Sequence, residues 1–337
     1  MTATPVGVLE ELDGEPIRPR PAPPRPMAWS RAMARASVVA ASRPRLWAFA
    51  LLAFLARGGL LALVVPMLVL PTFVGISNTV GPTSVTAAGP TPRLIAMIAT
   101  WLGVALVAIV GGTLIAAASE VALHRATVAP GADGAGSWFP SVAIAAAPPS
   151  HRAALRVATV RLGLLLPVAI ALAAAVPAWV QAAYRELLLP SDLAVPLPVR
   201  VIAGAPLQAA VAVAAWLAAE VLGGLAARRV ALHGSSVAAA LRAAAGDVAR
   251  APVSSILTLA VAIGGTLLVL VPAVVAVGVA WDRARIALVD GTDAAAVIAA
   301  TLVLVVAWTG CLVVAGMAAA WRSALWTAEL ARRAWTG

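Results

Sequence analysis

Two charged residues lie within apolar stretches of the sequence, and their spacing gives them a similar depth. Arg57 lies seven residues beyond Ala50, where a first membrane-spanning helix is expected to begin, and Glu220 lies eight residues before Arg228, near the end of a fourth. At 1.5 Å per residue, both charges are roughly 10 to 12 Å from the same membrane face. A charge at the membrane centre costs at least about 2.5 kcal/mol, so it needs a partner. We therefore predict an ion pair between Arg57 and Glu220, which either fixes helix packing or binds a solute or lipid headgroup.

The histidines do not predict a metal site. Glu120 and His124 are four residues apart and would share one face of a helix. A zinc site needs further ligands, and no suitable residue follows nearby. All three histidines, His124, His151 and His233, map to the side of the predicted bundle that carries most arginines. We therefore expect them to lie among lipid headgroups, and we predict no metal ion.

Motifs for catalysis are also missing from the sequence. The chain contains no lysine, so a phosphate-binding Gly-x-x-x-x-Gly-Lys loop is impossible, and it contains neither His-Glu-x-x-His nor Gly-x-Ser-x-Gly. The segments between the apolar stretches are too short to form a soluble catalytic domain. We therefore expect no enzymatic activity, no catalytic residue and no cofactor. Any process driven by ATP would require a partner protein, such as a separate ATPase subunit.

The composition of the whole chain is that of a membrane protein. Of 337 residues, 62% are hydrophobic and 11% are charged, whereas about a quarter are charged in a typical soluble domain. The 24 basic residues, all of them arginine, exceed the 14 acidic residues and give a net charge of +10. A lipid bilayer with an anionic inner leaflet is the expected partner. Nucleic acid is not, because the arginines are distributed between long uncharged stretches rather than gathered on one solvated face.

Long uncharged stretches predict six membrane-spanning helices, since about 20 apolar residues cross the hydrocarbon core. The fold is therefore expected to be all-α and polytopic, with helices at residues 50–75, 94–118, 158–181, 201–226, 256–280 and 295–319. Prolines occur within four of these helices, but neighbouring helices in a membrane can satisfy the carbonyl groups that a proline leaves free. The prolines therefore do not change the count.

The distribution of arginines predicts the orientation of the chain. With the N-terminus inside, the inner segments contain 18 arginines and the outer loops five, and cytoplasmic flanks retain arginine. Both termini are therefore expected to be cytoplasmic, and the bias toward alanine and arginine favours a bacterial cytoplasmic (inner) membrane. Residues 1–27, rich in proline and arginine, predict a disordered cytoplasmic tail that is either a solvated tether or a ligand for a partner. Residues 29–43 and 236–250 predict either interfacial amphipathic helices or extensions of the helices that follow.

The sequence also contains an internal repeat. Residues 58–66 and 264–272 agree or nearly agree at seven of nine positions, and both segments end in proline. A second marker, Ala-Leu followed by histidine or tryptophan, recurs at residues 122–124, 231–233 and 324–326. Two unrelated markers with similar spacing predict three repeated helical hairpins of one orientation.

Each predicted hairpin enters the membrane from the inside, crosses it and returns. The three hairpins comprise residues 28–125, 126–233 and 234–337, and the last ends in a short cytoplasmic helix. When the first and fifth helices are aligned by the repeat, Arg57 takes the place of Ile263. The intramembrane arginine is therefore expected to be specific to the first repeat.

The crossing pattern is similar to that of small six-helix bacterial membrane proteins of unassigned role, including the membrane part of some glycerophosphodiester phosphodiesterases. Kinship with mitochondrial carriers is excluded, because Leu68, Trp179 and Val274 take the acidic place of the carrier signature. We expect an integral membrane protein that acts as a permease-like or transporter-like subunit for a small or lipid-like substrate. The alternative is a membrane scaffold or regulatory partner subunit that transports nothing.

Overall fold

The computed structural model of the chain describes residues 28–68, 85–86, 89–129, 150–192, 194–289 and 293–333. The predicted tail at residues 1–27 lies outside the described residues. Within them, six helices are long and apolar enough to cross a membrane, which confirms the predicted all-α architecture with six spans. The described residues also include an antiparallel pair of two-residue strands, β1 (Val85–Thr86) and β2 (Gly89–Pro90).

The spans are mostly long, continuous helices. The first span, Pro44–Met67, is the exception, and it consists of α2 (Pro44–Phe54), the π-turn η1 (Leu55–Gly59), α3 (Leu60–Val64) and the short 3-10 turn η2 (Val65–Met67). The other five are α5 (Pro92–Val128), α6 (His151–Leu188), α8 (Pro206–His233), α10 (Pro252–Val289) and α11 (Ala294–Arg333). The three shorter helices are α1 (Trp29–Ser42), α7 (Leu197–Ala203) and α9 (Val237–Arg250).

Most spans extend beyond the predicted limits, because the uncharged stretch sets only the part that must lie in lipid. The helix predicted at residues 94–118 continues to Val128, and the one predicted at 295–319 continues to Arg333. Residues predicted to form a separate C-terminal helix therefore continue α11 instead. The first span begins at Pro44 rather than at residue 50.

Prolines mark helix starts but do not break the spans. Pro167 and Pro177 lie inside α6, and Pro272 lies inside α10, as the sequence predicted. The helix predicted at residues 201–226 starts later, at Pro206, because a proline disfavours helical backbone at the residue before it.

The two arginine-bearing stretches form separate helices, α1 and α9, rather than extensions of the next span. Each ends at a residue with non-helical backbone, Arg43 or Ala251, directly before the proline that begins α2 or α10. Their apolar faces pack on protein, α1 against α11 and α9 against α8. The Nε1 atom of Trp29 donates to Thr258 Oγ1 over 3.1 Å and so connects α1 to α10.

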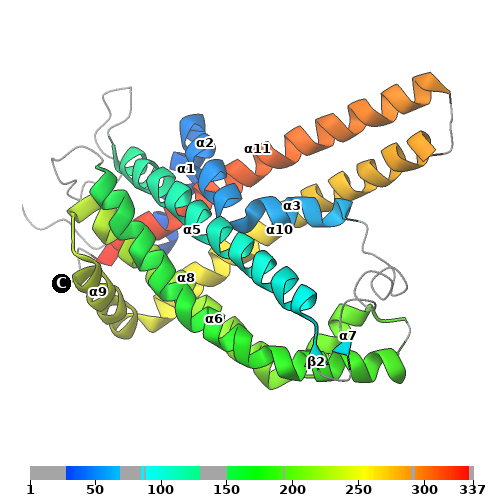
Figure 1. Ribbon diagram of the computed structural model, residues 1–337. Helices are drawn as coiled ribbons and strands as arrows, with labels where there is room; N and C mark the ends of the chain where they lie inside the picture. The colour runs from blue at the N-terminus through cyan, green and yellow to red at the C-terminus, as the bar shows by residue number, and fades with distance from the viewer. Residues whose placement is uncertain are drawn as a thin grey trace, which may run out of the picture.

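The helices converge at one end of the molecule and splay at the other (Figure 1). The converging end, which we call the arginine-rich end, contains α1, α9 and the C-termini of α5, α8 and α11. Consecutive spans pack together, α6 with α8 and α10 with α11, and α5 contacts both α2 and α6. That these pairs are sequence repeats stays a prediction.

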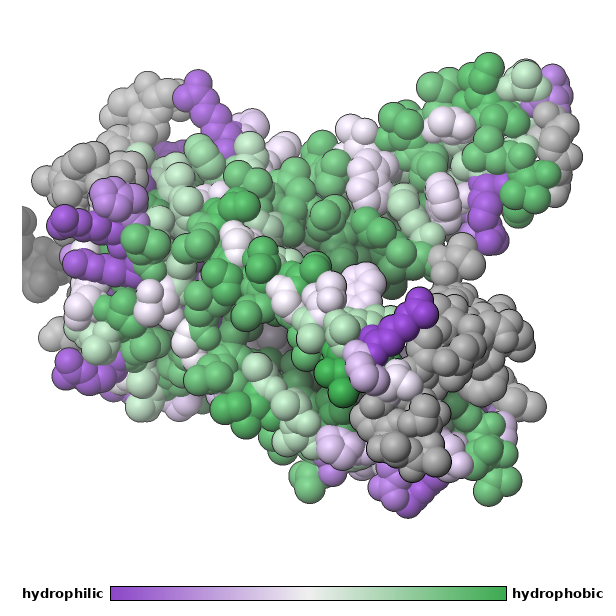
Figure 2. Space-filling view, viewed as in Figure 1, coloured by the Kyte–Doolittle hydropathy of each residue, from purple (hydrophilic) through white to green (hydrophobic). Residues whose placement is uncertain are grey.

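Burial follows the same division. In α5 the buried residues begin at Thr113, and in α11 they begin at Cys311, so the splayed halves contain almost none. Large apolar side chains such as Trp101 and Leu302 are exposed there. In the space-filling view, hydrophobic residues cover the middle of the molecule and hydrophilic ones gather toward its two ends, as expected for a protein in lipid (Figure 2).

Candidate functional site

The first span is broken at Arg57. The backbone leaves the helical region at Arg57 (φ −90°, ψ 19°) and at Gly58 (φ 95°, ψ 0°). A positive φ is readily adopted only by glycine, so the residue type at position 58 permits the break. The chain changes direction sharply between α2 and α3 (Figure 1).

The second half of the first span packs away from the first half. Leu63 of α3 is buried with Val277 of α10 and Cys311 of α11, whereas α2 contacts both α11 and α5. The break therefore places α3 on the side of α10 and α11, while α5 packs against α6 and α8. Between these two arms the surface is notched at the splayed end (Figure 2).

A glycine in α5 allows the break to approach closely. A Cβ atom on Gly112 would clash with the carbonyl oxygen of Ala56, well inside van der Waals contact. The neighbouring Gly111 has open space at the same position. Gly112 is therefore the residue that lets α5 pack against the backbone just before Arg57.

The carboxylate that pairs with Arg57 belongs to Glu120 of α5. Its side chain is only 4% exposed and also pairs with Arg161 of α6. The Arg161 guanidinium donates from Nη2 to both carboxylate oxygens of Glu120, each over 3.2 Å. One buried carboxylate thus joins the first, second and third spans.

The predicted direct pair between Arg57 and Glu220 is wrong in its partners. Glu220 of α8 forms its ion pair with Arg322 of α11. Spacing along the sequence gave the depth of each charge but not its position around the bundle. The predicted spans also ended before Glu120 and Arg322, and both helices in fact continue past these residues. Glu220 still lies near enough to Arg57 for the two charges to interact.

A fourth arginine, Arg228, has no carboxylate among its hydrogen-bond partners. Arg228 of α8 is 2% exposed and donates to the carbonyl oxygens of Gly224 and Ser323, over 2.6 and 2.7 Å. It also donates to the Ser323 and Thr327 hydroxyls, over 3.0 and 3.1 Å. These four bonds engage all three guanidinium nitrogens but do not neutralise the charge.

His124 lies among the same groups rather than among lipid headgroups, so that prediction is wrong for this residue. It is buried, one turn after Glu120, and its Nδ1 atom is 3.4 Å from the Ser323 hydroxyl. Its Nε2 atom has no hydrogen-bond partner in the described part of the chain. His151 and His233 are exposed, so the three histidines do not converge.

We call this set of groups the charge layer: Arg57, Glu120, Arg161, Glu220, Arg228 and Arg322. Its members come from five of the six spans. A sequence signal for it exists. Five of the six uncharged stretches end, on the arginine-rich side, at a member of the layer: residues 58–92, 94–119, 162–184, 201–219 and 294–321. In these five spans, the charged residue next to the uncharged stretch on the arginine-rich side therefore belongs to the charge layer.

Arg161 holds its place by lying over a glycine. A Cβ atom on Gly223 of α8 would be 2.5 Å from Arg161 Nη1. The guanidinium thus lies between Glu120 of α5 and the backbone of α8, one turn from Glu220. The layer is built from charged side chains packed on small residues, which is how helices approach closely in lipid.

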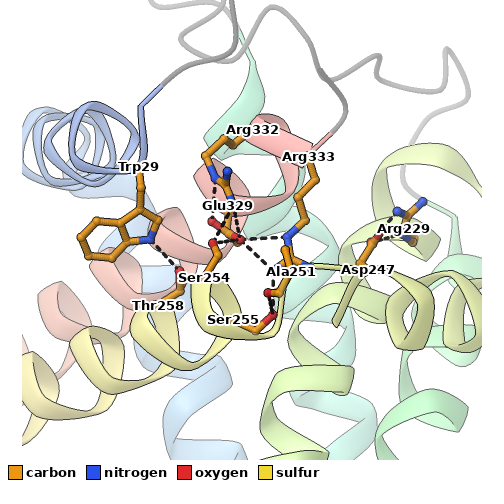
Figure 3. A network of polar contacts seen from close by, with 10 residues as sticks. All are labelled: Trp29, Arg229, Asp247, Ala251, Ser254, Ser255, Thr258, Glu329, Arg332 and Arg333. Atoms are coloured by element: carbon orange, nitrogen blue, oxygen red, sulfur yellow. Dashed lines mark hydrogen bonds and ion pairs between the residues drawn. The ribbon is translucent and has the colours of Figure 1, made fainter. Parts of the chain in front are cut away.

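A second polar cluster lies at the arginine-rich end, and we call it the C-terminal clamp: Ser254, Ser255, Glu329, Arg332 and Arg333 (Figure 3). Glu329 is fully buried and accepts from Arg332, Arg333 and Ser254. Arg333 Nη2 also donates to Ser255 Oγ over 2.7 Å. The clamp fastens the end of α11 to the start of α10.

The charge layer suits anions better than metal ions. In the described ranges no three His, Cys, Asp or Glu side chains lie together as metal ligands would. The layer instead presents planar guanidinium groups, which bind carboxylate and phosphate through paired hydrogen bonds. Comparison with known proteins adds no identity: no protein-family model, no curated protein and no solved structure matches the chain.

Proposed function

We propose that this integral membrane protein is a permease-like or transporter-like subunit, and that the charge layer handles its small or lipid-like substrate. The observation that supports the proposal best is the break of the first span at Arg57, beside the buried Glu120. In several transporter folds, substrate and ion sites lie at such interrupted helices, in the interior of the bundle.

The break gives the first span a place to bend. Gly58 connects α2, which packs with α11 and α5, to α3, which packs with α10 and α11. A change in the ion pairs of Glu120 would alter the angle between these two halves, since Arg57 lies at the joint. Movement of one arm against the other around a fixed site is the usual form of alternating access.

Orientation and energy source belong to the same proposal. We place the arginine-rich end in the cytoplasm of a bacterial cell, at the anionic inner leaflet, because arginine is retained on that side. The proposal is a non-enzymatic role, in which any energy comes from an ion gradient or from a partner such as an ATPase subunit.

Transport through the charge layer is tested in proteoliposomes that contain the full chain. Two probes are used: a fluorescent phospholipid, whose movement between leaflets is measured by dithionite quenching, and trapped carboxyfluorescein, whose release is measured by dequenching. We expect the wild-type protein to move at least one probe. We expect the double variant Arg57→Gln/Glu120→Gln, which removes one charge of each sign, to lose at least tenfold of that rate.

Arg152→Gln is the matched control, because Arg152 is exposed near the start of α6 and lies outside the charge layer. It should transport as the wild type does. If the wild type moves neither probe, or if the double variant moves them equally well, the transporter proposal is wrong. A non-transporting scaffold or regulatory partner would then be the better description.

A further inference from the structure

The charge layer contains more positive than negative charge. Among the residues that the structure describes, Arg57, Arg161, Arg228 and Arg322 face only two carboxylates, Glu120 and Glu220. Each of these arginines interacts electrostatically with another member of the layer, so the excess of two positive charges is not spread over distant sites. Uncompensated charge inside a membrane bundle is costly, and such charges mark binding sites for counter-charged groups.

The layer has an accessible side and a closed side. The side chains of Arg57 and Arg322 remain 30% and 27% exposed, although both are already paired with glutamates. Arg228 is enclosed by α8 and α11, where it supplies charge without direct access. A ligand would therefore meet Arg57 and Arg322 first, while Arg161 and Arg228 add to the positive field behind them.

The surface beside the accessible arginines is apolar. Residue 57 is followed along the first span by Leu60 and Leu61, and residue 322 is preceded along α11 by an uncharged, mostly apolar stretch back to Ala294. Leu60 and Leu61 are exposed on the outside of the protein. A group held at Arg57 therefore has polar contacts toward the arginine-rich end and apolar surface toward the splayed end, as the headgroup and tails of one lipid would require.

We infer that the charge layer binds the phosphate group of an anionic amphiphile, preferentially a phosphate monoester. This inference rests on the proposed function and names its substrate class. A monoester carries close to two negative charges at neutral pH and so balances the excess in the layer, whereas a diester carries one. Guanidinium groups favour phosphate because their donors match its oxygen atoms in pairs. The unpartnered Nε2 atom of His124 gives the same region one further polar group.

Lipid binding is tested by native mass spectrometry of the full chain in neutral detergent. The chain is titrated with short-chain phosphatidic acid, phosphatidylglycerol and phosphatidylcholine, which carry about two, one and no net charges. We expect the affinity to fall in that order, with at least a tenfold difference between the first and the last. That difference corresponds to about 1.4 kcal/mol.

Variants locate the binding. Arg57→Gln and Arg161→Gln should each weaken phosphatidic acid binding at least tenfold, and the control Arg152→Gln should stay within twofold of the wild type. Arg161→Lys keeps the charge but not the paired donors, so it should fall between Arg161→Gln and the wild type. Thermal unfolding of every variant checks that the fold is kept. Equal binding of phosphatidic acid by wild type and both glutamine variants would overturn the inference.

Soluble competitors separate a lipid headgroup from a free phosphate ester. Glycerol 3-phosphate at millimolar concentration should displace little phosphatidic acid, because it lacks the tails. If glycerol 3-phosphate displaced the lipid with an affinity equal to that of the lipid, the site would still bind phosphate, but the inference that its ligand is an amphiphile would be wrong. A second result to look for is a wild-type protein that binds no phosphatidic acid while its transport still depends on Arg57. That result would overturn this inference alone and leave the proposed function standing.

Discussion

The first and fifth spans are alike in sequence but not in structure. Gly58 and Gly59 break the first span, whereas Gly264 and Gly265 lie within the continuous helix α10. Where the first span has Arg57, the fifth has Ile263, which packs against an apolar cluster. A pair of glycines therefore does not break a membrane helix by itself.

The surroundings account for the difference. Arg57 is paired with Glu120, and Gly112 admits the backbone of the break at close range. In α10, Gly265 instead accommodates the ring of Trp321 from α11, and the helix continues. The same pair of glycines forms a break beside a charged residue in the first span and allows close helix packing in the fifth. Changes at the matched positions should therefore act differently in the two spans.

The largest effect is expected from Glu120→Ala. This change leaves Arg57 and Arg161 without their shared carboxylate, and loss of one partner from a buried ion pair costs about 3 to 5 kcal/mol. We expect a loss of that size in the free energy of unfolding, measured in mixed detergent micelles. Loss below about 1 kcal/mol would show that Glu120 does not hold the first three spans together.

A smaller effect is expected from Gly112→Ala, because the new methyl group would meet the Ala56 carbonyl oxygen. Overpacking of this kind costs about 1 to 3 kcal/mol. The matched control is Gly111→Ala, which meets open space in helical backbone and should leave the same free energy of unfolding unchanged or raise it by up to about 1 kcal/mol. Equal effects at the two neighbouring positions would contradict the close approach of α5 to the break.

The smallest effect is expected from the glycines themselves, but its sign should differ between the spans. Gly58→Ala forces a side chain into the left-handed region and should destabilise by about 1 to 2 kcal/mol. Gly264→Ala lies in helical backbone with open space and should stabilise by up to about 1 kcal/mol. Thermal unfolding of the two variants checks both signs, and the same sign in both would remove the distinction between the spans.

The sequence predicted the number of spans correctly because lipid sets a minimum length for uncharged stretches. Their ends were less predictable, since arginine and glutamate continue a helix well beyond the hydrocarbon core. The break at Gly58 could not be predicted, because the matching Gly264 lies in a helix and the cause is the contact with α5. Prolines, the expected sites of disturbance, lie inside continuous helices such as α6.

The candidate site was predictable in part. Arg57 and Glu220 both belong to the charge layer, so the cost of buried charge correctly predicted that both residues take part in ion pairs. The partners were wrong because charges at the ends of uncharged stretches were assigned to the membrane surface. Glu120, Arg161 and Arg322 are such charges. Which of several charges at one depth become neighbours depends on how the helices pack around the bundle.

Electron cryomicroscopy of the full chain in nanodiscs that contain phosphatidic acid, with a bound antibody fragment to add mass, tests the central claim most directly. We expect the first span to bend at Gly58, Arg57 to contact Glu120, and a lipid phosphate to lie within hydrogen-bonding distance of Arg57 and Arg322. A straight first span with Arg57 turned toward the lipid tails and no phosphate beside it would contradict the account.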